Sequence, residues 1–420
     1  MNKSAFCVRF LLKRMLCLAF LLSPFSFLIQ ISAQRYQADF HVSRANFSDT
    51  ISIDWEREQV YVPVYVDGRR YRFLLDTGAG QSVVFDGTPL AEGYRVGTII
   101  SHDAMNRTDT VSVVMLPPLV LGSTVLSGCR ATVTHTSPLA PRPTTAHRYD
   151  GILGFDLVNG GLSLKIDVPH RQLIVTDQPD LFLSDTKAPG AVIMKYRLFF
   201  HSPYIDITPF GNRRLRVLFD TGSRQFFSMN KQNFDVADAR AERRRSSEVP
   251  DYVVEGRSWG RHAIGHGGVE AEGEVVFLRL DNLRLGSYSF TDLHTITTQG
   301  GSHLGAPLLA YGAVVLDGKH RRFIFLPDGY EQPCRVSNRQ LEIAFVSDAQ
   351  GRPQAGIVWE GGVPWKQGFR SGDVIEAIDG RPVRSFAQFA TWGFERGRAY
   401  TFTLRGSDGR LRDVSWVRLP

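Results

Sequence analysis

The sequence predicts a mainly β chain built from two homologous halves. The tripeptide Asp-Thr-Gly occurs twice, at residues 76–78 and 220–222, each time directly after an apolar run. The 39 glycines among 420 residues favour many short turns, and therefore strands. An isolated charge is costly to bury, so two acids placed in the same way indicate carboxyl groups that meet. Paired carboxyl groups can carry out acid–base hydrolysis.

The segments before the two acids share one pattern of strand, short turn and strand. In the first, residues 61–66 and 69–75 flank Asp67-Gly68, and in the second, residues 202–207 and 212–218 flank the turn. The other matched segments are 119–123 with 283–287, 151–154 with 303–305, and 164–171 with 314–321. The repeat predicts two strand-rich lobes, residues 55–185 and 186–330, with one acid each and a pseudo-twofold axis between them.

The N-terminus has the pattern of a secretory signal peptide over residues 1–33. An apolar run at 16–29 ends near a small residue, Ala33. The basic residues that precede the run are Lys3, Arg9, Lys13 and Arg14. The run is shorter than the ~20 residues that span a bilayer, which favours cleavage over an uncleaved anchor. We therefore expect an exported protein (periplasmic, outer-membrane associated or secreted) with no stable membrane span. The sequence leaves open whether residues 34–54 are a propeptide or an extra strand.

Charge and cysteine content exclude some functions and leave others open. Without residues 1–33 the formal net charge falls from +7 to +3, because this segment holds four Lys or Arg residues and no Asp or Glu. So mild a charge predicts no nucleic-acid partner, and the basic run at 240–245 is interpreted as a solvated loop. Cys129 and Cys334 remain, and one disulfide or two separate thiols fit them equally well.

The two motifs, Leu75–Ala79 and Phe219–Ser223, each have a later apolar-apolar-Gly partner, although the second partner begins with His303 rather than an apolar residue. Together they resemble the lobes of a pepsin/retropepsin-type aspartic protease, over roughly residues 55–330. The resemblance implies a bilobal double β-barrel fold and an aspartic endopeptidase that acts on peptide or protein substrates without a cofactor. In such proteases the two catalytic acids, here Asp76 and Asp220, share a proton, activate a water molecule and titrate as a pair.

The resemblance also implies roles for the residues around the acids. The loop-supporting residues would be Thr77, Gly78, Thr221, Gly222 and Ser223. The threonines would hydrogen-bond across the twofold axis, and the glycines would let N–H groups approach the carboxylates. Ser223 stands where the first loop has Ala79, and donation from its hydroxyl would lower the pKa of a carboxylate. We therefore expect Asp220 to be the more often ionised acid.

Several positions depart from the family pattern. Arg224 follows the second motif and points either to solvent or to a substrate carboxylate. No obvious pepsin-like flap sequence is present, and the candidate flap residues are Gly97, Thr98, Gly267 and Gly268. His262 and His266 lie four residues apart but predict no metal site, because flanking glycines oppose a helix and no carboxylate or Cys completes a ligand set.

The pattern changes again after a linker at residues 331–340. Residues 372–380 contain Gly-Asp-Val-Ile and Ile-Asp-Gly, and Ser385 can cap a helix. Residues 341–420 resemble a bacterial, circularly permuted PDZ domain, a class that binds extended peptide ends by strand addition. The candidate groove residues are Ile343, Phe345, Phe386 and Phe389. The module would tether substrate or regulate; the alternative is a cap that only packs on the lobes. For the whole chain, the alternative is an inactive peptide-binding or scaffold protein that keeps the lobes.

Overall fold

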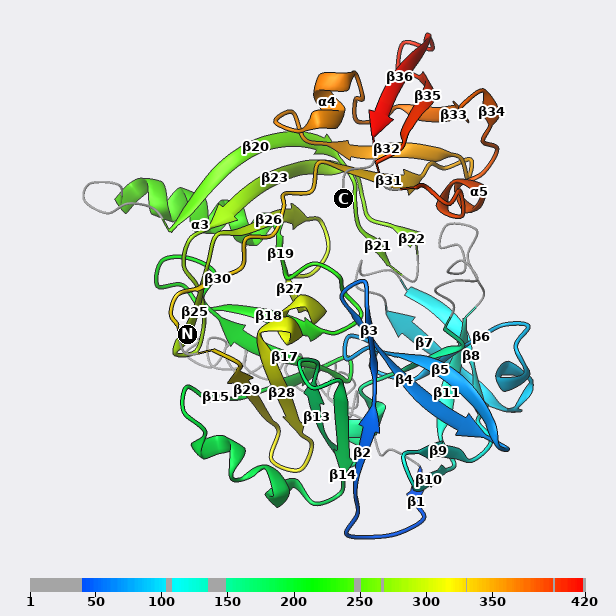
Figure 1. The fold of residues 1–420 in the computed structure, drawn as a ribbon, viewed down its shortest axis with the longest axis vertical. Helices are drawn as coiled ribbons and strands as arrows, with labels where there is room; N and C mark the ends of the chain where they lie inside the picture. Colours follow the sequence, from blue (N-terminus) through cyan, green and yellow to red (C-terminus); the bar gives the residue numbers. More distant parts are fainter. Residues whose placement is uncertain are drawn as a thin grey trace, which may run out of the picture. The chain divides into compact units, whose positions relative to one another are not determined.

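The computed structural model describes residues 40–102, 108–134, 149–244, 251–265, 268–329, 331–395 and 397–417. Strands dominate this part of the chain, which confirms the prediction of a mainly β fold (Figure 1). The predicted signal peptide and the segment up to residue 39 lie outside the described residues. No helix in the described ranges is both long and apolar enough to cross a membrane.

The first Asp-Thr-Gly triplet follows strand β5 (Arg69–Leu75) in a large sheet. β5 pairs antiparallel with β4 (Gln59–Val66) and parallel with β12 (Gly151–Leu153). Its last three residues are buried, so the apolar run delivers the acid to the edge of the core. On one side the sheet continues through β6 (Val83–Phe85), β11 (Arg130–Thr134), β8 (Thr108–Met115) and β7 (Tyr94–His102). On the other side lie β3 (Asp54–Glu56), β9 (Leu119–Leu121), β10 (Thr124–Ser127) and β1 (His41–Val42).

The second triplet begins at the last residue of β18 (Leu215–Asp220), in a sheet with the same strand order. β18 pairs antiparallel with β17 (Ser202–Ile207) and parallel with β27 (His303–Gly305), as β5 does with β4 and β12. The sheet continues through β19 (Phe227–Asn230), β26 (Leu293–Thr298), β23 (Gly273–Leu280) and β20 (Tyr252–Gly260), with β16 (Arg197–Phe199) outside β17. The internal repeat is therefore a repeat of structure.

A third sheet joins the two halves. At its centre β13 (Ser163–Asp167) pairs antiparallel with β28 (Gly312–Asp317). On each side follow a hairpin partner and an outer strand, which are β14 (Gln172–Thr176) with β2 (Ser48–Ser52) and β29 (Arg322–Pro327) with β15 (Val192–Lys195). This order is what a pseudo-twofold axis between the halves requires. β2 lies within residues 34–54, so this part of that segment forms a strand of the shared sheet.

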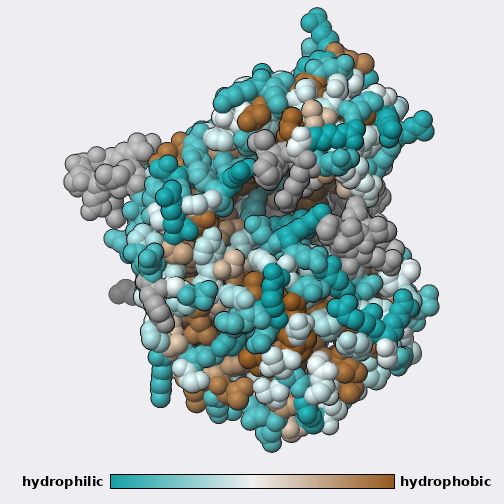
Figure 2. Space-filling model, in the orientation of Figure 1, coloured by the Kyte–Doolittle hydropathy of each residue, from teal (hydrophilic) through white to brown (hydrophobic). Residues whose placement is uncertain are grey.

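Short elements connect the sheets. These are β21 (Ile264–Gly265), β22 (Gly268–Val269), β24 (Leu283–Leu285), β25 (Tyr288–Thr291), β30 (Cys334–Arg335), α2 (Asp156–Asn159), α3 (Lys231–Arg244) and the 3-10 turns Pro89–Glu92, Pro179–Phe182, Asp185–Lys187 and Ala306–Tyr311. One cluster of buried apolar residues runs through both halves. Cys129 and Cys334 are two separate thiols. On the face drawn in Figure 2, hydrophobic residues are scattered among hydrophilic ones.

The C-terminal residues form a smaller sheet with its own core. Its strands are β31 (Ile343–Ser347), β32 (Pro353–Val358), β33 (Val374–Ile378), β34 (Arg381–Pro382), β35 (Ala399–Arg405) and β36 (Leu411–Val417). Two short helices accompany the sheet, α4 (Val363–Gln367) and α5 (Phe386–Ala390). Ser385 caps α5 by accepting the N–H of Gln388, as its position in the sequence predicts.

Candidate active site

The two Asp-Thr-Gly loops meet between the halves and are joined by their threonines. The N–H of Thr77 donates to Thr221 Oγ1 at 3.0 Å, and the N–H of Thr221 donates to Thr77 Oγ1 at 3.1 Å. The hydroxyl of Thr77 donates to the carbonyl of Phe219 at 2.6 Å, and that of Thr221 to the carbonyl of Leu75 at 2.7 Å. Both threonines are buried. Each donor therefore satisfies an acceptor of the opposite half, and this fixes the loops relative to each other.

The glycines place each carboxyl group against the opposite loop. The N–H of Gly78 donates to Asp76 Oδ1 and that of Gly222 to Asp220 Oδ1, both at 2.9 Å. A Cβ atom on Gly78 would lie 2.6 Å from Asp220 Oδ1, and one on Gly222 would lie 2.5 Å from Asp76 Cγ. No other residue fits at either position without moving a carboxyl group. The side chains of Asp76 and Asp220 also hydrogen-bond to each other.

The two acids differ in their electrostatic surroundings. Burial raises the pKa of Asp76 well above its ordinary value, and the charge and hydrogen bond of Asp220 raise it further. Burial also raises the pKa of Asp220, but the hydrogen bond from Asp76 and the backbone N–H groups of Gly222 and Ser223 oppose that rise. Two adjacent carboxyl groups cannot both ionise cheaply. The pair therefore favours a state in which the two acids share one proton, and the two titrate jointly.

The cause of this asymmetry differs from the one expected for Ser223. The backbone N–H of Ser223 favours the ionised form of Asp220. Its Oγ accepts the N–H of Gln225 at 3.3 Å, and among the described residues no bond joins this hydroxyl to either carboxyl group. Asp76 also receives two backbone donors, from Gly78 and Ala79. The predicted side-chain donation is thus not seen among the described residues, and the assignment of the charge to Asp220 stays a prediction.

Two residues outside the motifs also fasten the loops, and the sequence analysis did not identify them. Gln59, at the start of β4, donates from Nε2 to the carbonyl of Gly222 at 2.8 Å. Ser202, at the start of β17, donates from Oγ to the carbonyl of Gly78 at 2.9 Å. The two occupy equivalent places, each two residues before the tyrosine that pairs with the acid-bearing strand. The sequence did contain a signal for both residues, because each is a polar residue at the first position of the strand that precedes the acid-bearing strand.

Arg224 is held on the rim of the second loop. Its Nε and Nη2 donate to Gln59 Oε1 at 3.0 and 2.9 Å. The side chain is otherwise exposed. Burial raises the pKa of the nearby Glu58, and the charge of Arg224 partly offsets that rise. The sequence left two orientations open for Arg224, toward solvent or toward a substrate carboxylate. In the structure the guanidinium group is exposed, and the side-chain amide of Gln59 holds one edge of it.

One tyrosine lies within electrostatic reach of each acid. Burial raises the pKa of Tyr149 to about 12, and the charge of Asp76 contributes to the rise. Burial likewise raises the pKa of Tyr204, with a contribution from Asp220. Both phenols therefore stay protonated at neutral pH and can donate hydrogen bonds near the dyad.

The candidate flap residues lie in hairpins of the two halves. Gly97 and Thr98 lie in β7, which pairs with β8 through a bulge. Gly268 begins β22, beyond the end of β20, and Gly267 lies outside the described residues. The β20–β23 pair holds the same place in its sheet as the β7–β8 pair. That these hairpins cover the dyad remains a prediction.

His262 belongs to a buried pair with a carboxylate that the sequence analysis overlooked. Its Nε2 lies 3.5 Å from Glu270 Oε1 and 3.0 Å from the carbonyl oxygen of Thr297. The other oxygen of Glu270 accepts the hydroxyl of Thr298 at 2.6 Å. Within the described ranges no third side chain completes a metal-ligand set, and His266 lies outside them. The pair fastens the β21–β22 segment to β26.

The candidate groove residues of the C-terminal module lie together. The rings of Phe345 and Phe389 are 4.8 Å apart between centroids. Phe386 and Phe389 are buried in the module's core, and Ile343 and Phe345 pack against that core. Phe345 of β31 and Phe389 of α5 are therefore in contact with each other. Peptide binding there remains a prediction.

Comparison with known proteins identifies part of the chain. Residues 62–157 match the family model described as aspartyl protease. The matched region begins in β4, contains Asp76 with its loop, and ends in α2. This region is therefore aspartyl-protease-like. No curated protein matches the chain.

Proposed function

We propose that the protein is an aspartic endopeptidase that hydrolyses peptide bonds in peptides or proteins with Asp76 and Asp220. The observation that carries this proposal is the placement of each carboxyl group against the glycine of the opposite loop. The family match supports the role of the first acid. The same strand order around β18 supports an equal role for the second.

In this mechanism we assign the shared proton to Asp76 and the charge to Asp220, because the hydrogen bond between the acids adds to the pKa rise of Asp76 and opposes that of Asp220. The Asp220 carboxylate takes a proton from a water molecule as the water oxygen attacks the scissile carbonyl carbon, while Asp76 donates its proton to the carbonyl oxygen. As the tetrahedral intermediate collapses, Asp220 gives its proton to the leaving nitrogen and the C–N bond breaks. Asp76 regains a proton from a hydroxyl group of the intermediate. The dyad returns to its starting state, and no cofactor is needed.

The direct test of this function is digestion of casein and a mixed peptide library over a broad pH range. We expect internal cleavage, with one oxygen from labelled water in each new carboxyl group. Because no acyl-enzyme forms, added amines should give no transpeptidation product. A covalent acyl intermediate would contradict the proposal and favour another chemistry. No cleavage at any pH would favour the inactive peptide-binding alternative.

Export and peptide binding by the C-terminal module belong to the same proposal. Residues 1–33 would direct export and be removed, so the exported protein should begin after Ala33 when its N-terminus is sequenced. The module resembles a PDZ domain and would tether substrate or regulate cleavage. Peptides with free C-termini, compared with their amidated forms, test that binding.

A further inference from the structure

We propose that the C-terminal module is the fixed support of the β20–β23 hairpin, and that Gln340 positions the second acid loop through the neighbouring strand β26. That the module supports the hairpin is a claim about the fold alone. The effect of Gln340 on catalysis rests on the proposed function. A module that only carried substrate on a flexible tether would need no such contacts.

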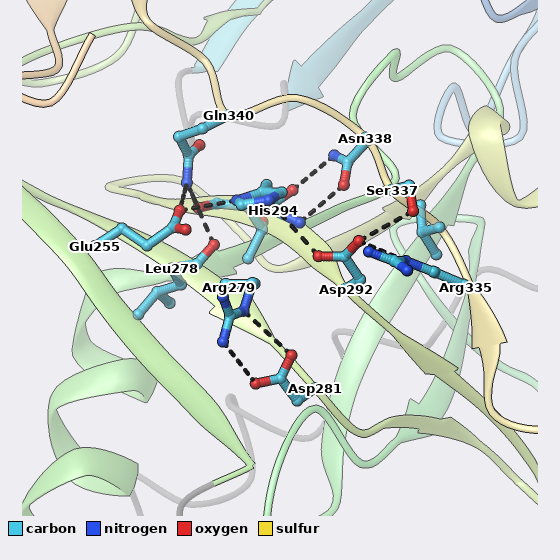
Figure 3. Close-up of polar contacts among 12 residues, drawn as sticks. Glu255, Leu278, Arg279, Asp281, Asp292, His294, Arg335, Ser337, Asn338 and Gln340 are labelled. Carbon is cyan, nitrogen blue, oxygen red and sulfur yellow. Dashed lines mark hydrogen bonds and ion pairs between the residues drawn. The ribbon is translucent and has the colours of Figure 1, made fainter.

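The predicted linker at residues 331–340 is fastened to the second half (Figure 3). The side chain of Asn338 accepts the N–H of His294 and donates to its carbonyl oxygen, both at 2.8 Å, and so substitutes for a neighbouring strand. Arg335 Nε and Ser337 Oγ donate to the same oxygen of Asp292 at 2.9 and 3.0 Å. With these contacts in place, the segment is not a free tether.

Gln340 ties three strands together with one buried amide. Its Nε2 lies 2.9 Å from Glu255 Oε2 in β20, 3.3 Å from the carbonyl oxygen of Leu278 in β23 and 3.2 Å from that of Thr295 in β26. The same oxygen of Glu255 lies 2.9 Å from His294 Nδ1. Figure 3 shows the Gln340 amide pointing toward Glu255 and Leu278. A buried amide without hydrogen-bond partners is costly. The three acceptors therefore favour the arrangement in which the module is docked on the second half.

The module and the hairpin also share an apolar core. Its fully or nearly buried members are Val275, Phe277 and Ile296 of the second sheet and Ile357 of the module. Partly buried residues of the module that pack against them are Leu341, Ala344 and Trp359. The backbones touch as well, because the N–H of Arg261 donates to the carbonyl of Gly356 at 2.8 Å. A Cβ atom on Gly356 would lie 2.2 Å from the carbonyl oxygen of Arg261.

A series of hydrogen bonds, linked to one another through the backbone, leads from Gln340 toward the second acid. Thr295, whose carbonyl accepts from Gln340, donates its hydroxyl to the carbonyl of Phe227 in β19. The preceding carbonyl, of Phe226, accepts the N–H of Gly305 at 2.9 Å. Gly305 lies opposite Asp220 in the parallel β27–β18 pair. Contiguity alone does not establish coupling, so the test measures both the hairpin and the chemistry.

The experiment uses the full chain with Gln340→Ala and a matched control, Gln388→Ala. Gln388 is a glutamine of the same module whose hydrogen bonds stay within it. We expect Gln340→Ala to speed amide hydrogen exchange in β20 and β23 by about tenfold or more. We also expect kcat to fall about tenfold with little change in KM, because the transition state depends on the position of the loop. The control should change neither.

Glu255→Leu is the second variant, for use if Gln340→Ala does not fold, because it keeps roughly the size of the side chain and removes the oxygen that accepts from the Gln340 amide. Unchanged exchange in β20 and β23 in the variants that fold overturns the support. Faster exchange with unchanged kcat overturns the positioning role. If the wild-type chain cleaves no peptide, the proposed function fails, and hydrogen exchange still decides the support.

Discussion

Gln59 of the first half and Arg224 of the second are joined by two hydrogen bonds, although they lie 165 residues apart. The same glutamine donates to the carbonyl of Gly222, so one side chain holds both the second acid loop and the cation beside it. Within the described ranges, the side chain of its counterpart Ser202 makes the bond to Gly78 and holds no cation. Both loops are therefore fastened, but not in the same way.

Gln59→Ala tests this fastening. The change leaves the Gly222 carbonyl without its side-chain donor and Arg224 without its acceptor. We expect the free energy of unfolding to fall by about 1–3 kcal/mol and kcat to fall about tenfold or more because the loop shifts. Chemical denaturation and peptide cleavage measure the two effects. Gln172→Ala, an exposed glutamine on β14, is the control, and equal behaviour of the two variants would contradict the role of Gln59.

Ser223→Ala tests the origin of the asymmetry between the acids. Because Ser223 acts on Asp220 through its backbone N–H, removing the hydroxyl should leave the acidic limb of the pH–rate profile in place, within about 0.3 pH units. The measurement is kcat/KM between acidic and neutral pH. A clear upward shift of that limb would mean that the hydroxyl does donate to the dyad.

Asp156→Asn should stabilise the protein at neutral pH. Burial raises the pKa of Asp156 to about 6, against the hydrogen bond from Ser82. The folded state therefore binds the proton more tightly, and stability is lost as pH rises through about 6. Asparagine keeps an acceptor for Ser82 and carries no charge, so we expect a gain of about 1–3 kcal/mol at pH 7. Denaturation at pH 4 and pH 7 should show the gain only at the higher pH.

His303→Ile gives the second half the residue that the first half has at Ile152. Burial lowers the pKa of His303 to about 4. Its neutral form therefore supports stability above pH 6.5, and this support is lost as pH falls toward 4. Isoleucine has no charge to gain, so between pH 6.5 and pH 4 the variant should lose less stability than wild type. We expect a difference of about 1–2 kcal/mol, at the low end for such a pKa shift, because the imidazole is only half-buried. Parallel stability curves for the two proteins would show that His303 does not titrate as described.

The repeat and the acid loops could be predicted because they follow local rules. An apolar run that ends at Asp76 or Asp220 predicts a buried strand, and the glycine two residues later predicts the turn. Together they predict where each carboxyl group lies. Contacts between distant residues could not be predicted in this way. Gln59, Gln340 and Glu270 each act on strands or loops far along the chain, and nothing in their neighbouring sequence shows it. The contacts of Gln340, at the end of the predicted linker, could not be foreseen for the same reason, since its partners lie on β20, β23 and β26.

The central claim is that Asp76 and Asp220 form one catalytic pair. The most direct measurement is kcat/KM on a single cleaved peptide for Asp76→Asn and Asp220→Asn, each shown to be folded. The control is Asp206→Asn, which changes a partly exposed aspartate of β17. We expect both dyad variants to lose activity by about a thousandfold or more, and the control to keep it. Substantial cleavage by either dyad variant would contradict a shared dyad.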